Sequence, residues 1–260
     1  MYSDQVDLSE KMDESRDFLD KLSISPDECD MLEKATRGQN CNQFWKEARS
    51  YLITASNFDS VIKRKPDTAP DLLVKKLRMY DKPLDTKALR YGRKFEKRAV
   101  KAYVQHHKAR CKSQVDVEYK GLQINPKYPY LGASVDGVIS CQKCKIGAVE
   151  VKCPFTGRHL NPTDCCKDSN FCCKFMDGEV LLKPNHRYFY QVMGQMAIAE
   201  LPWADFVIWT KKGMSVQRII FQSEVWEFML AKLHAFYLHS ILPELFTYRV
   251  QRKKALFPFK

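Results

Sequence analysis

The sequence predicts an α/β fold of the α+β type, because segments with the period of a helix and segments with the period of a strand both occur along its 260 residues. Apolar side chains recur at helical spacing over residues 84–104, whereas residues 148–152 alternate between apolar and charged. Residues 204–210 and 215–221 predict a β-hairpin around Gly213. Hydrophobic residues make up 45% of the chain, which is enough for a sizeable core.

Charge is unevenly distributed along the chain. Residues 1–33 contain eleven acidic and three basic residues, a net charge of −8, so the remaining residues carry a net charge of +20. Such a basic body favours a polyanion, most commonly nucleic acid, over the alternative of a merely soluble basic protein. We expect an acidic N-terminal appendage over residues 1–38, partly helical or mobile, a main domain over 39–245 and a basic tail over 246–260.

Residues 40–65 and 70–80 predict two helices in the first part of the main domain. Arg49, Thr54 and Ser56 lie close together in the first of these segments, and Thr54 or Ser56 is expected to cap the helix that follows. Hydroxyl groups, a helix N-terminus and an arginine together suit a phosphate group. The alternative is an ordinary helix cap beside a surface arginine.

The helix predicted at residues 84–104 places Glu96 on its apolar face, four residues from both Gly92 and Val100. Burial of an unpaired carboxylate is costly, so a metal ion or a buried arginine is expected to pair with it. The alternative is a glutamate at the helix edge, paired with a lysine.

Residues 113–124 alternate and predict strands, and residues 130–155 predict two further strands joined by a turn. Asp136 is expected at the end of the first strand of this pair, and Glu150 and Lys152 share one face of the second. Two carboxylates can hold a hard divalent cation, and a lysine can orient or help to deprotonate a water bound to it. This is the chemistry of phosphodiester hydrolysis, although an E-x-K sequence alone is more often a solvated strand face.

The second half of the chain predicts a long irregular connection, a helix and the hairpin already described. The connection covers residues 153–184, whose prolines, glycines and lysines suit a loop at the entrance to a site. In the helix at residues 186–200, Gln191 and Gln195 lie four residues apart and predict inward hydrogen bonds or, alternatively, surface amides. Ser223 is expected to cap the last long helix.

The chain contains ten cysteines, and its acidic start lacks the basic and apolar regions of a secretory signal. These features predict reduced thiols and an intracellular location, in the nucleus or the cytoplasm. Cys141 and Cys144 form a C-x-x-C pair, which leaves structural zinc open as a less favoured alternative because no second pair has that spacing. All apolar runs are far shorter than the roughly 18 residues of a membrane helix.

The order of these segments resembles the PD-(D/E)XK nuclease superfamily, and within it the lambda-exonuclease-like (YqaJ viral recombinase) family. The resemblance covers about residues 43–240 and implies a restriction-endonuclease-like core, with a central mixed β-sheet flanked by helices. The matching motifs are RSYLITAS (49–56), RYGRKFEKRA (90–99), LGASVDG (131–137), VEVKCPF (149–155), YFYQVMGQMAI (188–198) and DFVIWT (205–210).

The resemblance implies a role for each matching polar residue. Glu96, Asp136 and Glu150 correspond to the acidic residues around one or two Mg²⁺ or Mn²⁺ ions, with the main-chain carbonyl of Val151 as a further ligand. Lys152 corresponds to the catalytic lysine.

The remaining matches concern DNA and the helix beside the site. Arg49 and Ser56, with Thr54 beside them, correspond to the pocket for the 5′-phosphate of DNA. Gln191 corresponds to the motif glutamine at the active site. Gln195 is a candidate substitute for the second glutamine that the family often carries two residues after the first.

The function implied by the resemblance is 5′→3′ exonuclease activity on linear duplex DNA with free ends, in viral or mobile-element recombination. It further implies a single-strand annealing protein as a partner, and a homo-oligomer as one state of assembly. Three alternatives stay open: an endonuclease with the same fold, a catalytically inactive DNA-binding module, and an interaction domain stabilised by zinc.

Overall fold

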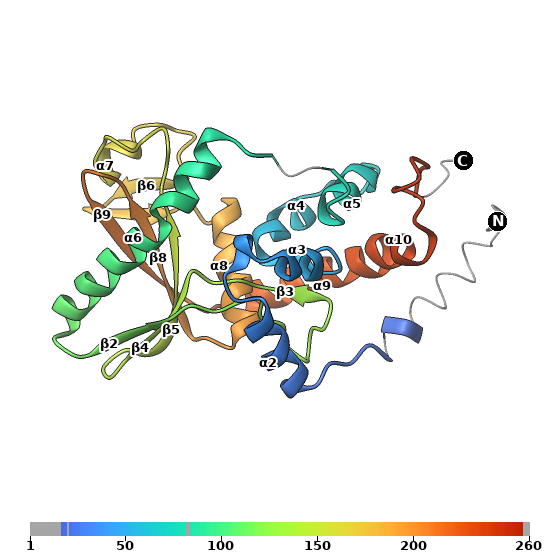
Figure 1. The fold of residues 1–260 in the computed structure, drawn as a ribbon. Helices are drawn as coiled ribbons and strands as arrows, with labels where there is room; N and C mark the ends of the chain where they lie inside the picture. The colour runs from blue at the N-terminus through green and yellow to red at the C-terminus, as the bar shows by residue number, and fades with distance from the viewer. Residues whose placement is uncertain (1–16, 20, 82–83, 257–260) are drawn as a thin grey trace.

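A computed structural model of the chain describes residues 17–19, 21–81 and 84–256. A five-stranded sheet forms its centre, with helix α6 along one face and helix α8 against the other (Figure 1). Helices α3, α4, α5, α9 and α10 gather beyond α8, away from the sheet (Figure 1). Within the described ranges, no helix is both long and apolar enough to cross a membrane.

The sheet has the strand order β2-β4-β5-β8-β9. Strands β5 and β8 run parallel, whereas the other neighbouring pairs are antiparallel. The sheet is therefore mixed, and the predicted α/β fold with a central mixed sheet and flanking helices is confirmed. The strands are β2 (Val115–Glu118), β4 (Gly137–Cys141), β5 (Lys145–Lys152), β8 (Trp203–Trp209) and β9 (Met214–Ile220).

Two small sheets and the helices complete the fold. Strand β1 pairs parallel with β3, and β6 pairs antiparallel with β7. The small strands are β1 (Ile53–Thr54), β3 (Leu131–Gly132), β6 (Cys173–Met176) and β7 (Glu179–Leu182). The α-helices are α2 (Pro26–Ala35), α3 (Gln43–Arg49), α4 (Phe58–Ile62), α5 (Asp71–Leu77), α6 (Lys87–Cys111), α7 (Pro162–Cys165), α8 (Arg187–Ala199), α9 (Ser223–Phe236) and α10 (Leu242–Thr247). The 3₁₀ helices η1 (Gln39–Cys41) and η2 (Ala55–Asn57) and the π-helix η3 (Tyr237–Ile241) adjoin them.

The alternation of strand β5 divides the core between two faces of the sheet. Val149 and Val151 are buried in the cluster that contains Tyr103 of α6. Ala148 is buried in the other cluster, which contains Met193 of α8. Because side chains alternate along a strand, Glu150 and Lys152 lie on the α8 face. The faces predicted for these four residues from 149 to 152 are confirmed.

Residues 40–65 do not form the single helix that their pattern predicts. Strand β1 interrupts the segment and pairs with β3, so α3 and α4 are separate helices. The predicted cap is also wrong, because Asn57 precedes α4 and neither Thr54 nor Ser56 caps a helix end through its side chain. The hydroxyls form hydrogen bonds with neighbouring side chains instead.

Three further expectations about local structure need correction. Asp136 immediately precedes β4 rather than ending a strand, because the strand before it, β3, stops at Gly132. The connection 153–184 is not irregular throughout, since it contains α7 and the β6–β7 hairpin. Ser223 is the first residue of α9, and the cap position belongs to Gln222, which makes no capping bond through its side chain.

Helix α2, from the acidic part of the sequence, contacts the connection between β2 and β3. The main-chain N–H of Gly121 donates to Glu33 Oε1 at 2.7 Å, and that of Leu122 donates to Thr36 Oγ1 at 2.7 Å. An added Cβ at Gly121 would lie 2.1 Å from the carbonyl oxygen of Glu33, so this close approach requires glycine. The described end of the acidic segment is thus attached to the main domain, while residues 1–16 lie outside the described part.

Candidate active site

The parallel strands β5 and β8 end side by side, and a cavity of about 580 Å³ lies at their carboxyl ends. Ligands of open α/β sheets commonly bind at this edge. Helix α6 forms one wall, the segment after β5 forms a second, and the start of α8 forms a third. The lining residues include Glu96, Val151, Lys152, Cys153, His186, Arg187 and Tyr188.

Glu150 is 2% exposed, and both of its carboxylate oxygens accept hydrogen bonds. Oε1 accepts from Gln191 Nε2 at 2.6 Å and is paired with Nζ of Lys152. Oε2 accepts from Gln195 Nε2 at 2.7 Å, and the same nitrogen donates to the carbonyl of Ser134 at 2.9 Å. Both glutamines therefore point inward and hold Glu150, which decides between the two readings that the sequence left open.

The side chain of Asp136 contacts strand β5 next to Glu150. Its Oδ2 accepts a hydrogen bond of 2.8 Å from the main-chain N–H of Val151. Burial raises the pKa of Asp136 well above its ordinary value, and repulsion by Glu150 and Glu96 raises it further. The attraction of Lys152 and the bond to Val151 offset only part of this effect.

Glu96 reaches the same group of charges from helix α6 and lines the cavity. The neighbouring Phe95 ring stacks on Trp209 at the end of β8, with 5.5 Å between ring centroids, and this contact fixes α6 at the height of the site. Burial raises the pKa of Glu96, and the charge of Glu150 raises it further. Glu96 lines the cavity as predicted, and the charges that act on it are those of Glu150, Lys152 and Lys97 rather than that of an arginine.

The amine of Lys152 is held by an acid and an aromatic ring. Its Nζ contacts Glu150 and lies 4.5 Å from the ring centroid of Tyr188. Burial alone would lower the pKa of Lys152, but the attraction of Glu150, Tyr188 and Asp136 outweighs burial and raises it above its ordinary value. The side chain is therefore a charged donor that can orient or stabilise an oxygen anion, and this geometry does not favour it as a base.

The donor set fits a hard divalent cation. Asp136, Glu150 and Glu96 offer carboxylate oxygen, the ligand that Mg²⁺ and Mn²⁺ prefer, and the main chain of Val151 lies among the lining residues. Burial is the main cause of the raised pKa values of Asp136 and Glu96, and repulsion by Glu150 adds to it at both residues. A divalent cation would relieve that repulsion.

Arg49 forms a second polar group next to the first. Its guanidinium lies 4.2 Å from the ring centroid of Trp45, and its Nη2 donates to Ser56 Oγ at 3.2 Å. Burial lowers the pKa of Arg49 to about 10, and within the described ranges no carboxylate forms an ion pair with it. Thr54 is buried behind Ser56, with 3.4 Å between their hydroxyls, so Arg49 and Ser56 are the groups that can meet a ligand.

Ser134 connects the two polar groups. Its hydroxyl accepts a hydrogen bond of 2.9 Å from the indole of Trp45, while its carbonyl accepts from Gln195. Gly194 brings helix α8 against η2 and Phe58, since an added Cβ there would lie 2.3 Å from the Phe58 ring. The pocket formed by Arg49 and Ser56, here called the arginine pocket, is therefore connected to the carboxylates through Ser134 and helix α8.

Sequence reasoning missed Trp45 and Ser134, which shape these sites, and it placed Tyr188 on the face that carries Gln191 and Gln195 without assigning it a role. Tyr188 lies three residues before Gln191, so helical spacing gave a signal that it faces the same way. Trp45 lies four residues before Arg49 on helix α3, and this spacing also predicts contact. Ser134 carries no such signal, because its importance depends on contacts with α3 and α8.

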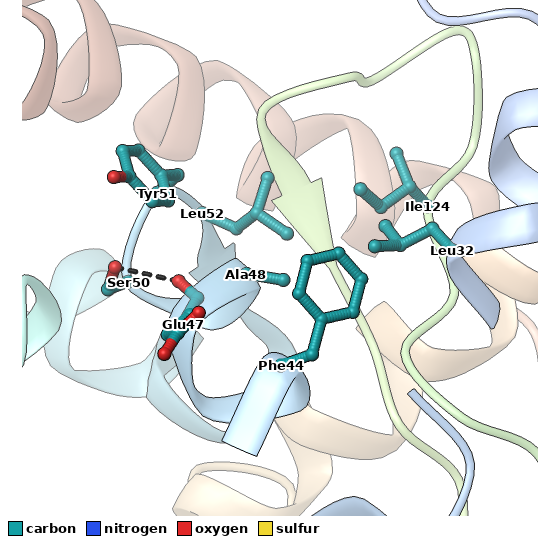
Figure 2. Close-up of a pocket in the computed structure, with 8 residues that line it drawn as sticks. All are labelled: Leu32, Phe44, Glu47, Ala48, Ser50, Tyr51, Leu52 and Ile124. Carbon is teal, nitrogen blue, oxygen red and sulfur yellow. Dashed lines mark hydrogen bonds between the residues drawn. The ribbon is translucent and has the colours of Figure 1, made fainter. Parts of the chain in front are cut away.

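A separate pocket of about 480 Å³ lies between α2, α3 and the segment around Ile124 (Figure 2). Phe44, Leu52 and Ile124 point into it, and Glu47 supplies its one carboxylate. It contains one carboxylate and no lysine among its lining residues, unlike the larger cavity, and is not the candidate active site.

The family model of the YqaJ-like viral recombinase domain matches residues 44–202. This span covers more than half of the chain and contains Arg49, Asp136, Glu150, Lys152 and Gln195. The protein belongs to the YqaJ-like viral recombinase family. The search of curated proteins returned no match.

Solved structures share the fold at low sequence identity. LHK-Exo in complex with dAMP is 22% identical, with a TM-score of 0.57 over 77% of this chain and 94% of that one. The alkaline exonuclease LHK-Exo from Laribacter hongkongensis is also 22% identical, with a TM-score of 0.56 over 78% and 96%. The Shutoff and Exonuclease Protein from Kaposi's sarcoma-associated herpesvirus is 13% identical, with a TM-score of 0.51 over 98% and 76%.

Proposed function

We propose that the protein is a metal-dependent deoxyribonuclease that degrades linear duplex DNA from its ends. The observation that carries the proposal is the set formed by buried Glu150 and half-buried Asp136, Glu96 and Lys152 beside an open cavity. Membership of a viral recombinase family and the fold shared with alkaline exonucleases support it. The basic body of the chain supplies the charge that a polyanion needs.

Asp136, Glu150 and Glu96 would hold Mg²⁺ or Mn²⁺, with the carbonyl of Val151 as a further ligand. When bound, such a cation neutralises phosphate charge and makes a water molecule more acidic. Gln191 and Gln195 keep the carboxylate of Glu150 oriented through their bonds to its two oxygens. The ammonium of Lys152 holds the attacking oxygen in place and stabilises negative charge that develops on the phosphate.

Arg49 and Ser56 would set the polarity of digestion by binding the 5′-phosphate at a DNA end. A partly buried guanidinium without an ion-pair partner among the described residues is suited to a terminal phosphate, because a doubly charged anion would compensate its burial. A 5′-phosphate held there would place the next phosphodiester near the carboxylates, since Ser134 links the two groups. Digestion would then proceed 5′→3′, in viral or mobile-element recombination with a single-strand annealing protein as partner.

The test uses linear duplex DNA in which one strand has a 5′-phosphate and each strand has its own label, incubated with Mg²⁺ or Mn²⁺. We expect stepwise loss of the strand with the 5′-phosphate and no cutting of closed circular DNA. The Asp136→Ala protein is the inactive control. Cutting of the circle would identify an endonuclease of the same fold, and tight binding without cleavage would identify a DNA-binding module.

A further inference from the structure

A second group of side chains with metal-binding chemistry lies at the far end of helix α6, outside the cavity. His107 and Cys111 come from the last turns of α6, Cys141 ends strand β4, and Cys144 lies in the turn before β5. One ligand atom from each of the four lies within 4.8 Å of the other three. We propose that these four residues form a structural zinc site that joins α6 to the β4–β5 hairpin.

The tautomer of His107 is set by a buried hydrogen-bond chain. The hydroxyl of Tyr103 donates to Asp205 Oδ2 at 2.6 Å, and the same hydroxyl lies 2.9 Å from Nδ1 of His107. Because the Tyr103 proton is used toward Asp205, the remaining contact requires an N–H on Nδ1 of His107. In the neutral imidazole Nε2 then carries the lone pair, and ligating histidines in proteins are commonly oriented by such a bond on their other nitrogen.

The free nitrogen of His107 points to a missing partner. The residue is 3% exposed, and its Nε2 is buried without a hydrogen-bond partner among the described residues. A buried polar atom in this state is costly unless something binds it. The nearby ligand atoms are three sulfurs, which makes a metal ion the fitting occupant.

The turn between β4 and β5 presents its two cysteines together. Lys145, directly after Cys144, has a φ of +63°, a backbone conformation that residues other than glycine adopt rarely. Cys144 Sγ lies 3.3 Å from Cys111 Sγ, and the hydroxyl of Ser113 lies 3.3 Å from Cys141 Sγ, where it can donate to a thiolate. Cys111 and Cys144 are free thiols, and the distance between their sulfurs is close to that of two ligands on one tetrahedral ion.

The ligand types identify the metal class and the kind of site. Three thiolates and one imidazole are the soft and borderline donors of tetrahedral zinc, and a fourth protein ligand leaves no open position for catalysis. Binding would release the three thiol protons and leave one net negative charge at the site. The guanidinium of Arg218 is paired with Asp205 and also interacts with Cys144, so it places positive charge beside the sulfur ligands.

The site would act on the fold at a distance from the reaction. Helix α6 carries Glu96 eleven residues before His107, about 16 Å along the helix. The hairpin carries Asp136 before its first strand and Glu150 near the end of its second. A zinc ion at the other end of both elements would fix the helix against the hairpin and so preserve their alignment at the cavity.

Metal analysis of the reduced, full-length protein tests the proposal without DNA or nuclease activity. We expect one tightly bound zinc per chain after purification from zinc-containing medium, and near-complete loss of zinc in Cys111→Ser and Cys144→Ser. Cys41→Ser, an exposed cysteine outside the group, is the matched control and should keep its zinc. Cobalt in place of zinc should give the thiolate charge-transfer and tetrahedral ligand-field bands, which identify sulfur ligands in the folded protein.

Stability gives the second readout. The two serine variants should unfold at a midpoint lower by about 5 °C or more, and wild type treated with a zinc chelator should show the same loss. Wild-type protein without zinc, or a Cys111–Cys144 disulfide in its place, would overturn the proposal. So would zinc that persists in both serine variants and disappears in Asp136→Ala, because the metal would then occupy the carboxylate site.

Discussion

Replacement of Arg49 tests how the protein recognises a DNA end. Arg49→Ala removes a guanidinium that donates to Ser56 and stacks on Trp45, and it breaks no ion pair that the structure describes. The stacking contact of this partly buried group is worth about 0.5–2 kcal/mol, so the fold should tolerate the change with a modest loss of stability. Arg49→Lys keeps a positive charge and removes the planar group, and is the matched variant.

The expected loss in kcat/KM depends on how many N–H donors of Arg49 are available to bind a phosphate. Nη2 uses one hydrogen on Ser56, so most of the five N–H donors stay free. A charge-assisted hydrogen bond contributes about 1.5–3 kcal/mol, which corresponds to a loss of roughly 10- to 150-fold in kcat/KM. The pKa of Arg49 is about 10, so the group is charged at pH 8 and the loss should be present there in full.

The assay compares kcat/KM on two duplexes that differ only in a 5′-phosphate or a 5′-hydroxyl. We expect wild type to prefer the phosphorylated end, Arg49→Ala to lose most of that preference, and Arg49→Lys to recover a part of it. Activity on the hydroxyl end should change little. Equal losses on both duplexes would show that Arg49 is a general contact to the DNA backbone, and the reasoning from its unpaired charge would be refuted.

Three further predictions concern the carboxylate site. Because the fold raises the pKa of Asp136, the contribution of this group to the stability of the metal-free protein is most favourable below its ordinary pKa and is lost as pH rises through the raised pKa. Asp136→Asn should therefore raise the midpoint of thermal unfolding in a chelator at neutral pH, by about 2–4 °C per kcal/mol of relieved repulsion, and should abolish stabilisation by added Mn²⁺. Lys152→Ala should abolish cleavage while metal-dependent DNA binding, measured by fluorescence anisotropy, stays nearly intact; retained turnover would remove Lys152 from the mechanism. Gln195→Ala leaves one oxygen of Glu150 without its donor and should lower kcat by about 10-fold or more with little change in DNA affinity, whereas Gln195→Glu should be worse because it adds a like charge.

Periodicity predicted the parts of the fold whose pattern is local. Alternation located β5, and helical spacing located α6 and placed Glu96 inward. The hairpin of β8 and β9 and the inward glutamines of α8 follow from the same signals. In each case the side chains that define the pattern lie on one element, so the sequence contains the whole signal.

Features that depend on distant segments could not be predicted in this way. Strand β1 forms because Ile53 pairs with Leu131, and the pattern of residues 40–65 contains no signal for this distant partner. Ser134 joins the arginine pocket to Glu150 only because α3 and α8 both pack against it. The four proposed zinc ligands show the same limit: His107 and Cys111 have helical spacing, but their meeting with the C-x-x-C turn is a property of the tertiary fold.

The β4–β5 hairpin separates two kinds of metal chemistry along its length. The sulfur ligands lie at its turn and the carboxylates at its open end, about 20 Å apart for the six residues of extended chain from Cys144 to Glu150. Hard oxygen ligands favour Mg²⁺ or Mn²⁺, whereas thiolates favour zinc, so each site selects its ion by ligand type rather than by competition for one position. A chelator strong enough to strip zinc would then lower stability and activity together, while removal of Mg²⁺ alone would stop activity and leave the zinc-dependent part of the stability in place. Thermal unfolding of wild type after dialysis into Mg²⁺-free buffer, followed by addition of a zinc-specific chelator, separates the two sites, because the second step should lower the unfolding midpoint only if the turn holds a metal of its own.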